Sequence, residues 1–145
     1  MTHIAIMKKS RKLLPKILAG AKTIESRWYV NKVAPWDKIS VGDTVYFRNS
    51  GEPVTVMATA SKVLQVANLD YTIILDICLK YGKKIGFESH SYEFWANECI
   101  RTKKRYLILI FLTDVQKIVP FRVNKAGFGS ACAWMCVQDI TKVKL

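Results

Sequence analysis

One uninterrupted apolar run limits the folds that are open to this chain of 145 residues. The stretch "RYLILIFLT", residues 105–113, is apolar for most of its length and lacks the alternation of a half-exposed strand. A run of this kind is typical of a central β-strand that is covered on both faces. The sequence therefore predicts a sheet with packed layers on both sides.

Alternating and helical patterns before this run predict further elements. The stretch "HIAIMK" predicts a first strand, and "RKLLPKILAG" predicts a short helix with Pro15 in its first turn and Gly20 at its end. Residues 22–30 predict a strand because polar and apolar side chains alternate with a period of two. One face then holds Ile24, Ser26 and Trp28, and the other holds Thr23, Glu25, Arg27 and Tyr29.

The middle and end of the chain predict a hairpin, two helices and a last strand. Residues 42–47 and 54–66 flank the turn "NSGEP" as a strand pair. One helix is expected between a cap at Asp70 and a stop at Gly82, and a second is expected after a cap at Ser91. The tail adds "KIVPFRV", a glycine loop "KAGFGSA" and a strand in "AWMCVQDI".

These elements predict a single α+β domain over residues 1–145. Strands and helices mix without strict βαβ alternation, and several strands meet at short turns. The pattern favours a small, mostly antiparallel β-barrel with flanking helices. An open α+β sandwich is the alternative.

The charge of the chain is strongly positive and unevenly distributed. Lys and Arg number 23 against 11 Asp and Glu, a formal charge of +12. The first forty residues hold nine basic side chains and only Glu25 and Asp37 as acids. An N-terminal basic face of this size favours polyanionic partners, with nucleic acid first, although lysines also serve solubility.

Other classes of protein are disfavoured by the sequence. No apolar run is long enough to span a bilayer, and no signal core is present, so we expect a cytoplasmic protein without a membrane partner. The four cysteines are expected as reduced, mostly buried thiols. "CAWMC" has the wrong spacing for a zinc pair, so no metal and no cofactor are predicted.

The stretch "AGAKTIESRW" gathers an ammonium, a carboxylate and a guanidinium at the mouth of one strand. Glu25 and Arg27 share a strand face, and Lys22 enters from the preceding turn. Such a cluster can hold its geometry and offer hydrogen-bond donors to a phosphate or a base edge. A plain surface ion pair is the competing interpretation.

This motif resembles that of the ASCH domain family of the PUA-like superfamily. The matching residues are Gly20, Lys22, Thr23, Glu25 and Arg27, followed by a strand that opens at Gly42 and Asp43. The resemblance is dense over about the first 65 residues and continues only in element order. It implies a PUA-like β-barrel with a cleft between barrel and helices that is lined by the Lys-Glu-Arg group.

The resemblance also implies function. The family contains RNA-associated domains, and some members resemble enzymes that hydrolyse an acylated cytidine or cleave RNA. In such members a lysine at the position of Lys22 takes part in the chemistry, and a carboxylate comes from a distant part of the chain. Glu25 stands where those hydrolases can carry a hydroxyl residue. Glu88, Glu93 and Glu98 are the candidates for the distant carboxylate.

We therefore expect an RNA- or nucleotide-binding cleft, with DNA as another polymer that it could bind. The expected contacts are Lys22, Glu25, Arg27, Tyr29, Lys8, Lys12, Lys16, Arg48, Asn49 and Ser50. The alternatives are an amidohydrolase acting on an acylated cytidine-type nucleoside or a ribonuclease, with Lys22 and Glu25 as catalytic residues, and a protein-interaction domain. Tyr29 is the expected stacking residue.

Three aromatic or glycine-rich features complete the predictions. Trp28 and Trp134 are expected in the core, and Trp36 is expected to be the most exposed tryptophan. "AGFGSA" is expected to form a turn, with Ser130 as a minority candidate for an anion contact. It lacks the spacing of known phosphate-binding loops.

Overall fold

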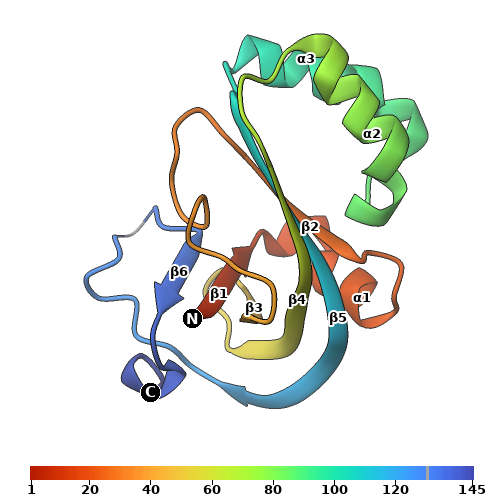
Figure 1. Cartoon of the computed structure of the whole chain (residues 1–145). Helices are drawn as coiled ribbons and strands as arrows, with labels where there is room; N and C mark the ends of the chain where they lie inside the picture. The colour runs from red at the N-terminus through yellow and green to blue at the C-terminus, as the bar shows by residue number, and fades with distance from the viewer. Residues whose placement is uncertain (130) are drawn as a thin grey trace.

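A curled six-stranded sheet is the main element of the computed structural model, which describes residues 1–129 and 131–145 (Figure 1). The strands are β1 (Thr2–Met7), β2 (Ile24–Tyr29), β3 (Thr44–Asn49), β4 (Val54–Val66), β5 (Tyr106–Phe121) and β6 (Trp134–Val137). Their order is β2-β5-β4-β3-β1-β6, and only the β1–β3 pairing is parallel among these strands. The predicted mostly antiparallel α+β fold is confirmed, as a curled half-barrel rather than a sandwich.

Three helices flank the sheet. They are α1 (Leu13–Leu18), α2 (Tyr71–Ile85) and α3 (Tyr92–Arg101), with short 3₁₀ turns at Lys9–Arg11, Ser89–Ser91 and Ile140–Lys142. α2 and α3 pack together at one end of the molecule, beyond the body of the barrel (Figure 1), and α1 packs against β5 and β3. No helix in the described part of the chain combines the length and apolarity needed to cross a bilayer.

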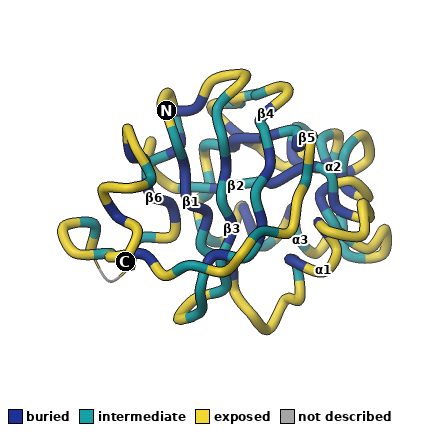
Figure 2. Tube along the Cα trace, turned by 90° about the horizontal axis from the view of Figure 1, so that it is seen from below, coloured by how far each residue is buried: buried dark blue, intermediate teal, exposed yellow. Residues whose placement is uncertain are grey.

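Strand β5 is covered on both faces, as its apolar run predicted. Leu107 and Leu109 pack into the cluster that α2 and α3 form on one face. Ile108 and Ile110 pack on the other face, in the core enclosed by the curled sheet and α1. All four side chains are buried, and the buried positions concentrate along the strands in Figure 2. The run is therefore continuous because both of its faces are covered.

Helix α1 agrees with the sequence prediction in most respects. Leu14 and Ile17 are buried in the barrel core, and Pro15 lies in the first turn. Gly20 follows the helix in the left-handed region at φ 77°. Leu18, which was expected on the buried face, is exposed.

Helix α2 begins at the predicted cap but ends later than predicted. The Asp70 carboxylate accepts the backbone N–H of Ile73. The expected stop at Gly82 is wrong, since the helix continues to Ile85 and Gly86 caps it at φ 104°. Gly82 has a packing role instead: a Cβ there would lie 2.5 Å from the Tyr92 ring. The glycine permits close contact with α3.

One further prediction needs correction. Ser91 does not cap α3 through its side chain, because its hydroxyl donates to the Glu88 carbonyl in a 3₁₀ turn. The first residues of the stretch "KIVPFRV" continue β5 up to Phe121. Register shifts between β4 and β5 let this long strand curl with its neighbour. Ser130, the minority candidate for an anion contact, lies outside the described residues.

The two ends of the curled sheet approach one another at Arg27. This residue lies on β2, at one end of the strand order. Its guanidinium donates to Ala133 O (3.1 Å) just before β6 and to Ile6 O (3.4 Å) on β1. It also lies over the Trp134 ring, 5.1 Å from the centroid. The Arg27 side chain thus links the two edges that backbone pairing leaves open.

Candidate functional site

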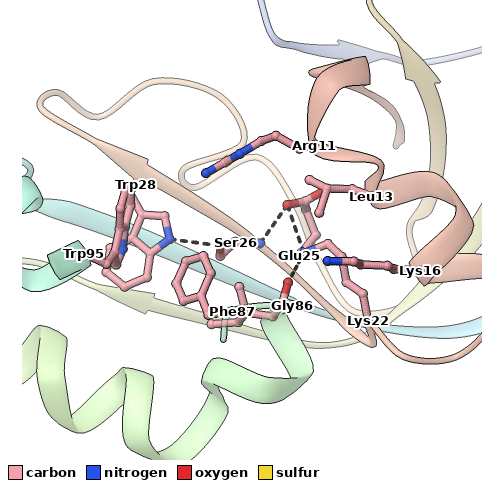
Figure 3. A pocket seen from close by; sticks show the side chains of 11 residues that line it. Arg11, Leu13, Lys16, Lys22, Glu25, Ser26, Trp28, Gly86, Phe87 and Trp95 are labelled. Atoms are coloured by element: carbon pink, nitrogen blue, oxygen red, sulfur yellow. Dashed lines mark hydrogen bonds and ion pairs between the residues drawn. The ribbon is translucent and has the colours of Figure 1, made fainter. Parts of the chain in front are cut away.

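A cavity of about 280 Å³ lies between the barrel, α1 and the α2–α3 pair (Figure 3). Its lining combines a charged end, an aromatic end and a basic rim. The lining residues are Arg11, Leu13, Lys16, Lys22, Glu25, Ser26, Trp28, Ile85, Gly86, Phe87 and Trp95. The expected cleft between barrel and helices is therefore present, with Lys22 and Glu25 in its wall.

Lys22 is buried and held by backbone carbonyls. Its side chain is 2% exposed, and its ammonium donates to Ile24 O at 2.7 Å and to Ile85 O at 2.6 Å. Ile85 is the last residue of α2, so Lys22 ties the end of that helix to β2. Burial lowers the pKa of Lys22, the Glu25 carboxylate 3.7 Å away raises it, and the charge of Arg27 lowers it further. The net shift favours the neutral amine.

Glu25 lies between the two cations. Its Oε1 accepts the backbone N–H of Ser26 at 2.9 Å. Its Oε2 is 3.9 Å from Arg27 Nη2 and has no hydrogen-bond partner. The side chain is 5% exposed. This buried carboxylate oxygen is thus compensated in charge but has no hydrogen-bond donor in the described chain.

A second cavity of about 290 Å³ continues from the first one. The two share six lining residues, namely Arg11, Leu13, Glu25, Ser26, Trp28 and Trp95. The second cavity is bordered by Arg27 and Tyr29 from β2 and by Lys8 and Lys104 at its edge. Together the two cavities provide space for more than one ring of a ligand.

Aromatic rings form the wall opposite the charged end. Trp28 and Trp95 meet edge to face with ring centroids 5.6 Å apart, and Phe87 lies 5.6 Å from Trp95. The Trp28 indole donates to Ser26 Oγ at 2.9 Å. Figure 3 shows these rings on one side of the cavity and Lys22 with Glu25 on the other. Such a wall suits a flat heterocycle.

The structure brings together six of the ten predicted contacts. Lys22, Glu25 and Lys16 line the first cavity, and Glu25, Arg27, Tyr29 and Lys8 line the second. The Tyr29 ring is half-buried against the barrel core, and burial raises the pKa of its hydroxyl. The remaining contacts do not line either cavity within the described residues; these are Lys12, Arg48, Asn49 and Ser50.

The predicted distant carboxylate does not reach the site. None of the three candidates lines either cavity in the described part of the chain. Glu88 and Glu93 are exposed, and Glu98 pairs with Arg101 on α3. Glu25 is the only carboxylate in the lining of the two cavities as described.

Several residues that line the cavities were not among the contacts predicted from the sequence. Arg11, Gly86, Phe87, Trp95 and Lys104 come from segments that meet only in the folded chain. Trp28 is buried as predicted but also faces the cavity, and Trp36 is half-buried against Tyr106 instead of exposed. Trp95 follows the cap expected at Ser91 on the second predicted helix, and no sequence signal distinguishes a core ring from a cavity ring.

No histidine or cysteine lines either cavity in the described part of the chain. Over residues 1–129 and 131–145, no group of three His, Cys, Asp or Glu side chains could hold a metal ion. The four cysteines are free, and burial raises the pKa of Cys78 to about 11 and that of Cys99 to about 12. Such thiols are poor nucleophiles at neutral pH.

Solved structures share this fold at low sequence identity. The ASCH protein of Zymomonas mobilis superposes with a TM-score of 0.66 at 14% identity, over 97% of this chain and 91% of that one. A point variant of that protein gives 0.67 at 14% identity, over 97% and 93%. The hypothetical protein PH0355 gives 0.53 at 18% identity, over 81% and 100%.

These comparisons bear on the fold alone. No family model and no curated protein matches the sequence. The chain nevertheless has the fold of the ASCH protein of Zymomonas mobilis over almost its whole length. The fold predicted from the Lys-Glu-Arg motif is thereby confirmed.

Proposed function

We propose that this protein binds RNA, with one base of the strand inside the cavity at Lys22 and Glu25. The observation that carries the proposal is the lining of that cavity. An aromatic wall faces a polar end with an unpaired acceptor, and the space of about 280 Å³ accommodates a ring of nucleobase size. Bases splayed out of a single strand are commonly bound by stacking and by hydrogen bonds to their edges.

The charge around the cavities supports a nucleotide polymer as the ligand. Arg11 and Lys16 border the first cavity, and Lys8 and Lys104 border the second. Glu25 is the one acid in either lining as described. Phosphates on both sides of an inserted base would meet these cations. A longer strand would have to leave the cavities to reach Lys12, Arg48, Asn49 or Ser50.

The resemblance to RNA-associated ASCH domains supports the same class of ligand. The fold of the Zymomonas mobilis ASCH protein extends over 97% of the chain. Of the three side chains of the Lys-Glu-Arg motif, Lys22 lines the first cavity, Arg27 lines the second and Glu25 lines both. RNA is therefore the first polymer to test, and single-stranded DNA of the same sequence is the comparison.

Hydrolysis of an acylated nucleoside is the second candidate, and the lowered pKa of Lys22 is the observation that favours it. Two features weigh against it. The Lys22 ammonium is occupied by two backbone carbonyls, and none of the predicted distant carboxylates lines the site within the described residues. Incubation with an N-acylated cytidine tests this candidate, and the candidate requires release of the acid that Lys22→Met abolishes.

The binding proposal is tested with a fluorescent single-stranded RNA of about ten nucleotides. We expect wild-type protein to bind it, and Arg11→Ala with Lys16→Ala to weaken binding about tenfold or more at low salt. The matched control is Lys117→Ala with Lys142→Ala, which removes the same charge from exposed positions outside both cavities. Equal losses for the two double variants would contradict a localised site.

The fate of the probe separates binding from cleavage. RNA recovered from the titration is run on a denaturing gel. An intact strand agrees with the binding proposal, whereas shortened products that disappear in Lys22→Met would replace it by the ribonuclease alternative. Thermal unfolding of each variant shows whether a loss of binding reflects a loss of fold.

A further inference from the structure

Two buried polar atoms in the cavity walls lack partners in the described part of the chain. They are Glu25 Oε2, an acceptor, and the indole Nε1 of Trp95, a donor. Both residues line both cavities, and each of the two atoms has less than 1 Å² of accessible surface, so a ligand reaches them through a small movement of the cavity wall. Native proteins rarely leave such atoms unpaired without a reason.

The two cations beside Glu25, Lys22 and Arg27, donate their hydrogen bonds to backbone carbonyls. The Lys22 ammonium donates to Ile24 O and Ile85 O and lies 3.7 Å from the other oxygen, Oε1. Arg27 donates to the backbone of β1 and of the segment before β6, and it is 3.9 Å from Oε2. Both distances exceed that of a hydrogen bond. The cations therefore balance the charge of Oε2 while leaving its lone pairs open.

The two indoles of the aromatic wall differ in whether their N–H group has a hydrogen-bond acceptor. Trp28 donates its N–H to Ser26 Oγ at 2.9 Å. Trp95 packs against Trp28 and Phe87, but its N–H meets no acceptor of the described chain. The second indole thus supplies a donor where a phenylalanine would supply packing alone.

We infer that the inserted base is recognised by these two atoms: it donates an N–H to Glu25 Oε2 and accepts the N–H of Trp95. This inference rests on the proposed function and assigns Trp95 a specificity-determining role. Each of the four bases carries donors and acceptors at different positions on its edge. The cavity consequently ranks the bases by how well their edges match Glu25 and Trp95.

The test compares nucleotides with a ligand that lacks base edges. Calorimetric titrations use the 5′-monophosphates of adenosine, cytidine, guanosine and uridine, together with phenyl phosphate, which keeps an aromatic ring and an anion. We expect wild type to prefer one nucleotide over phenyl phosphate. Trp95→Phe lowers this preference about 3- to 10-fold, as loss of a hydrogen bond does. Trp28→Phe, in the same aromatic wall, should change the affinities for nucleotides and for phenyl phosphate alike, because its indole N–H is bonded to Ser26 Oγ.

Glu25→Gln provides an independent variant should Trp95→Phe not fold. Its amide is expected to accept from Ser26 and to turn an N–H toward the base, so the preferred nucleotide loses affinity while phenyl phosphate does not. Equal losses for nucleotides and phenyl phosphate in both variants would overturn the inference.

The proposed function and the inference can fail separately. Wild-type protein that binds the RNA probe but does not distinguish any nucleotide from phenyl phosphate retains the function and loses the inference. Wild-type protein that binds neither RNA nor nucleotides loses both. Selective loss in Trp95→Phe and Glu25→Gln supports the inference.

Discussion

Three charged residues within six positions of one another have different environments. Lys22 is held by two carbonyls, Glu25 keeps one free oxygen, and Arg27 connects the edges of the sheet. Spacing in the sequence predicts one cluster, because spacing indicates proximity but not hydrogen-bond partners. Their separate hydrogen-bond partners come from Ile85, Ala133 and β1, which are remote or unremarkable in the sequence. Only Glu25 is left available to a ligand as an acceptor.

His3 gives a prediction for the dependence of stability on pH. The ring is fully buried, its Nε2 lies 2.9 Å from Asp43 Oδ2, and its Nδ1 accepts the indole N–H of Trp134. Burial lowers the pKa of His3, an effect that Asp43 opposes in part. Between this lowered pKa and the value of about 6.5 in the unfolded chain, the unfolded state binds more protons. The free energy of unfolding should therefore fall as the pH drops below about 6.5.

Urea unfolding of wild type and His3→Gln between pH 5 and pH 7.5 checks this expectation. The variant should lose part of the decrease, because its side chain does not titrate. His90 is exposed, so His90→Gln is the matched control and should follow wild type. A decrease of the same size in wild type and His3→Gln would contradict the assignment to His3.

The end of α2 shows how an element positions the site. Gly86 closes the helix at φ 104°, and Phe87 of the aromatic wall follows directly. A residue with a Cβ is strained in the left-handed region, by about 1–2 kcal/mol. No steric clash adds to this, since a Cβ at Gly86 would meet Lys22 Cδ at an ordinary 3.7 Å.

Gly86→Ala should accordingly lower the free energy of unfolding by about 1–2 kcal/mol. Thermal unfolding should show a fall in Tm of roughly 3–8 °C for a chain of this size. Lys83→Ala, an exposed substitution in the same last turn, should change stability by less than about 0.5 kcal/mol. An unchanged Tm in Gly86→Ala would mean that the helix end relaxes without strain.

The elements were more predictable than their ends and their contacts. Alternation identified β2, and the cap at Asp70 identified the start of α2, because both signals are local. Gly82 was mistaken for a stop, since the sequence does not show the Tyr92 ring that requires a small residue there. The position of Trp95 in the cavity wall was not predicted for the same reason. Whether a ring faces core or cavity depends on segments distant in the chain.

At the scale of the whole molecule, the Arg27 side chain links the two open edges of the curled sheet. Backbone pairing leaves β2 and β6 at the two ends of the strand order, and Arg27 connects them through Ala133 O and Ile6 O. Arg27→Met keeps the length of the stem but removes these donors. We expect the free energy of unfolding to fall by about 2–4 kcal/mol, since hydrogen bonds of a charged group are lost in a partly buried place.

Chemical denaturation measures this loss, and hydrogen exchange locates it. Exchange should increase along β1 and β6 more than in α2, which is far from the link. Arg101→Met removes a guanidinium from an exposed ion pair on α3 and should cost less than about 1 kcal/mol. Similar losses for the two variants would show that the barrel edges do not depend on Arg27.

The net charge of +12 raises the question of whether RNA binding is local or distributed over the molecule. Each phosphate contact with a single strand contributes about 0.7 to the slope of log K against log salt concentration. If the strand follows the cavities, Arg11→Ala should reduce the slope by roughly 0.7 because Arg11 borders both of them. Lys117→Ala, from an exposed position of β5 outside both linings, should leave the slope unchanged.

Titrations of the same RNA at four salt concentrations from 50 to 200 mM decide between the two modes. A distributed field would lower the slope by similar small amounts in both variants, since each removes one charge of many. A difference confined to Arg11→Ala places phosphates beside the base cavity. The basic excess of the chain would then act mainly on the encounter with RNA, while the cations at the cavities hold the bound strand.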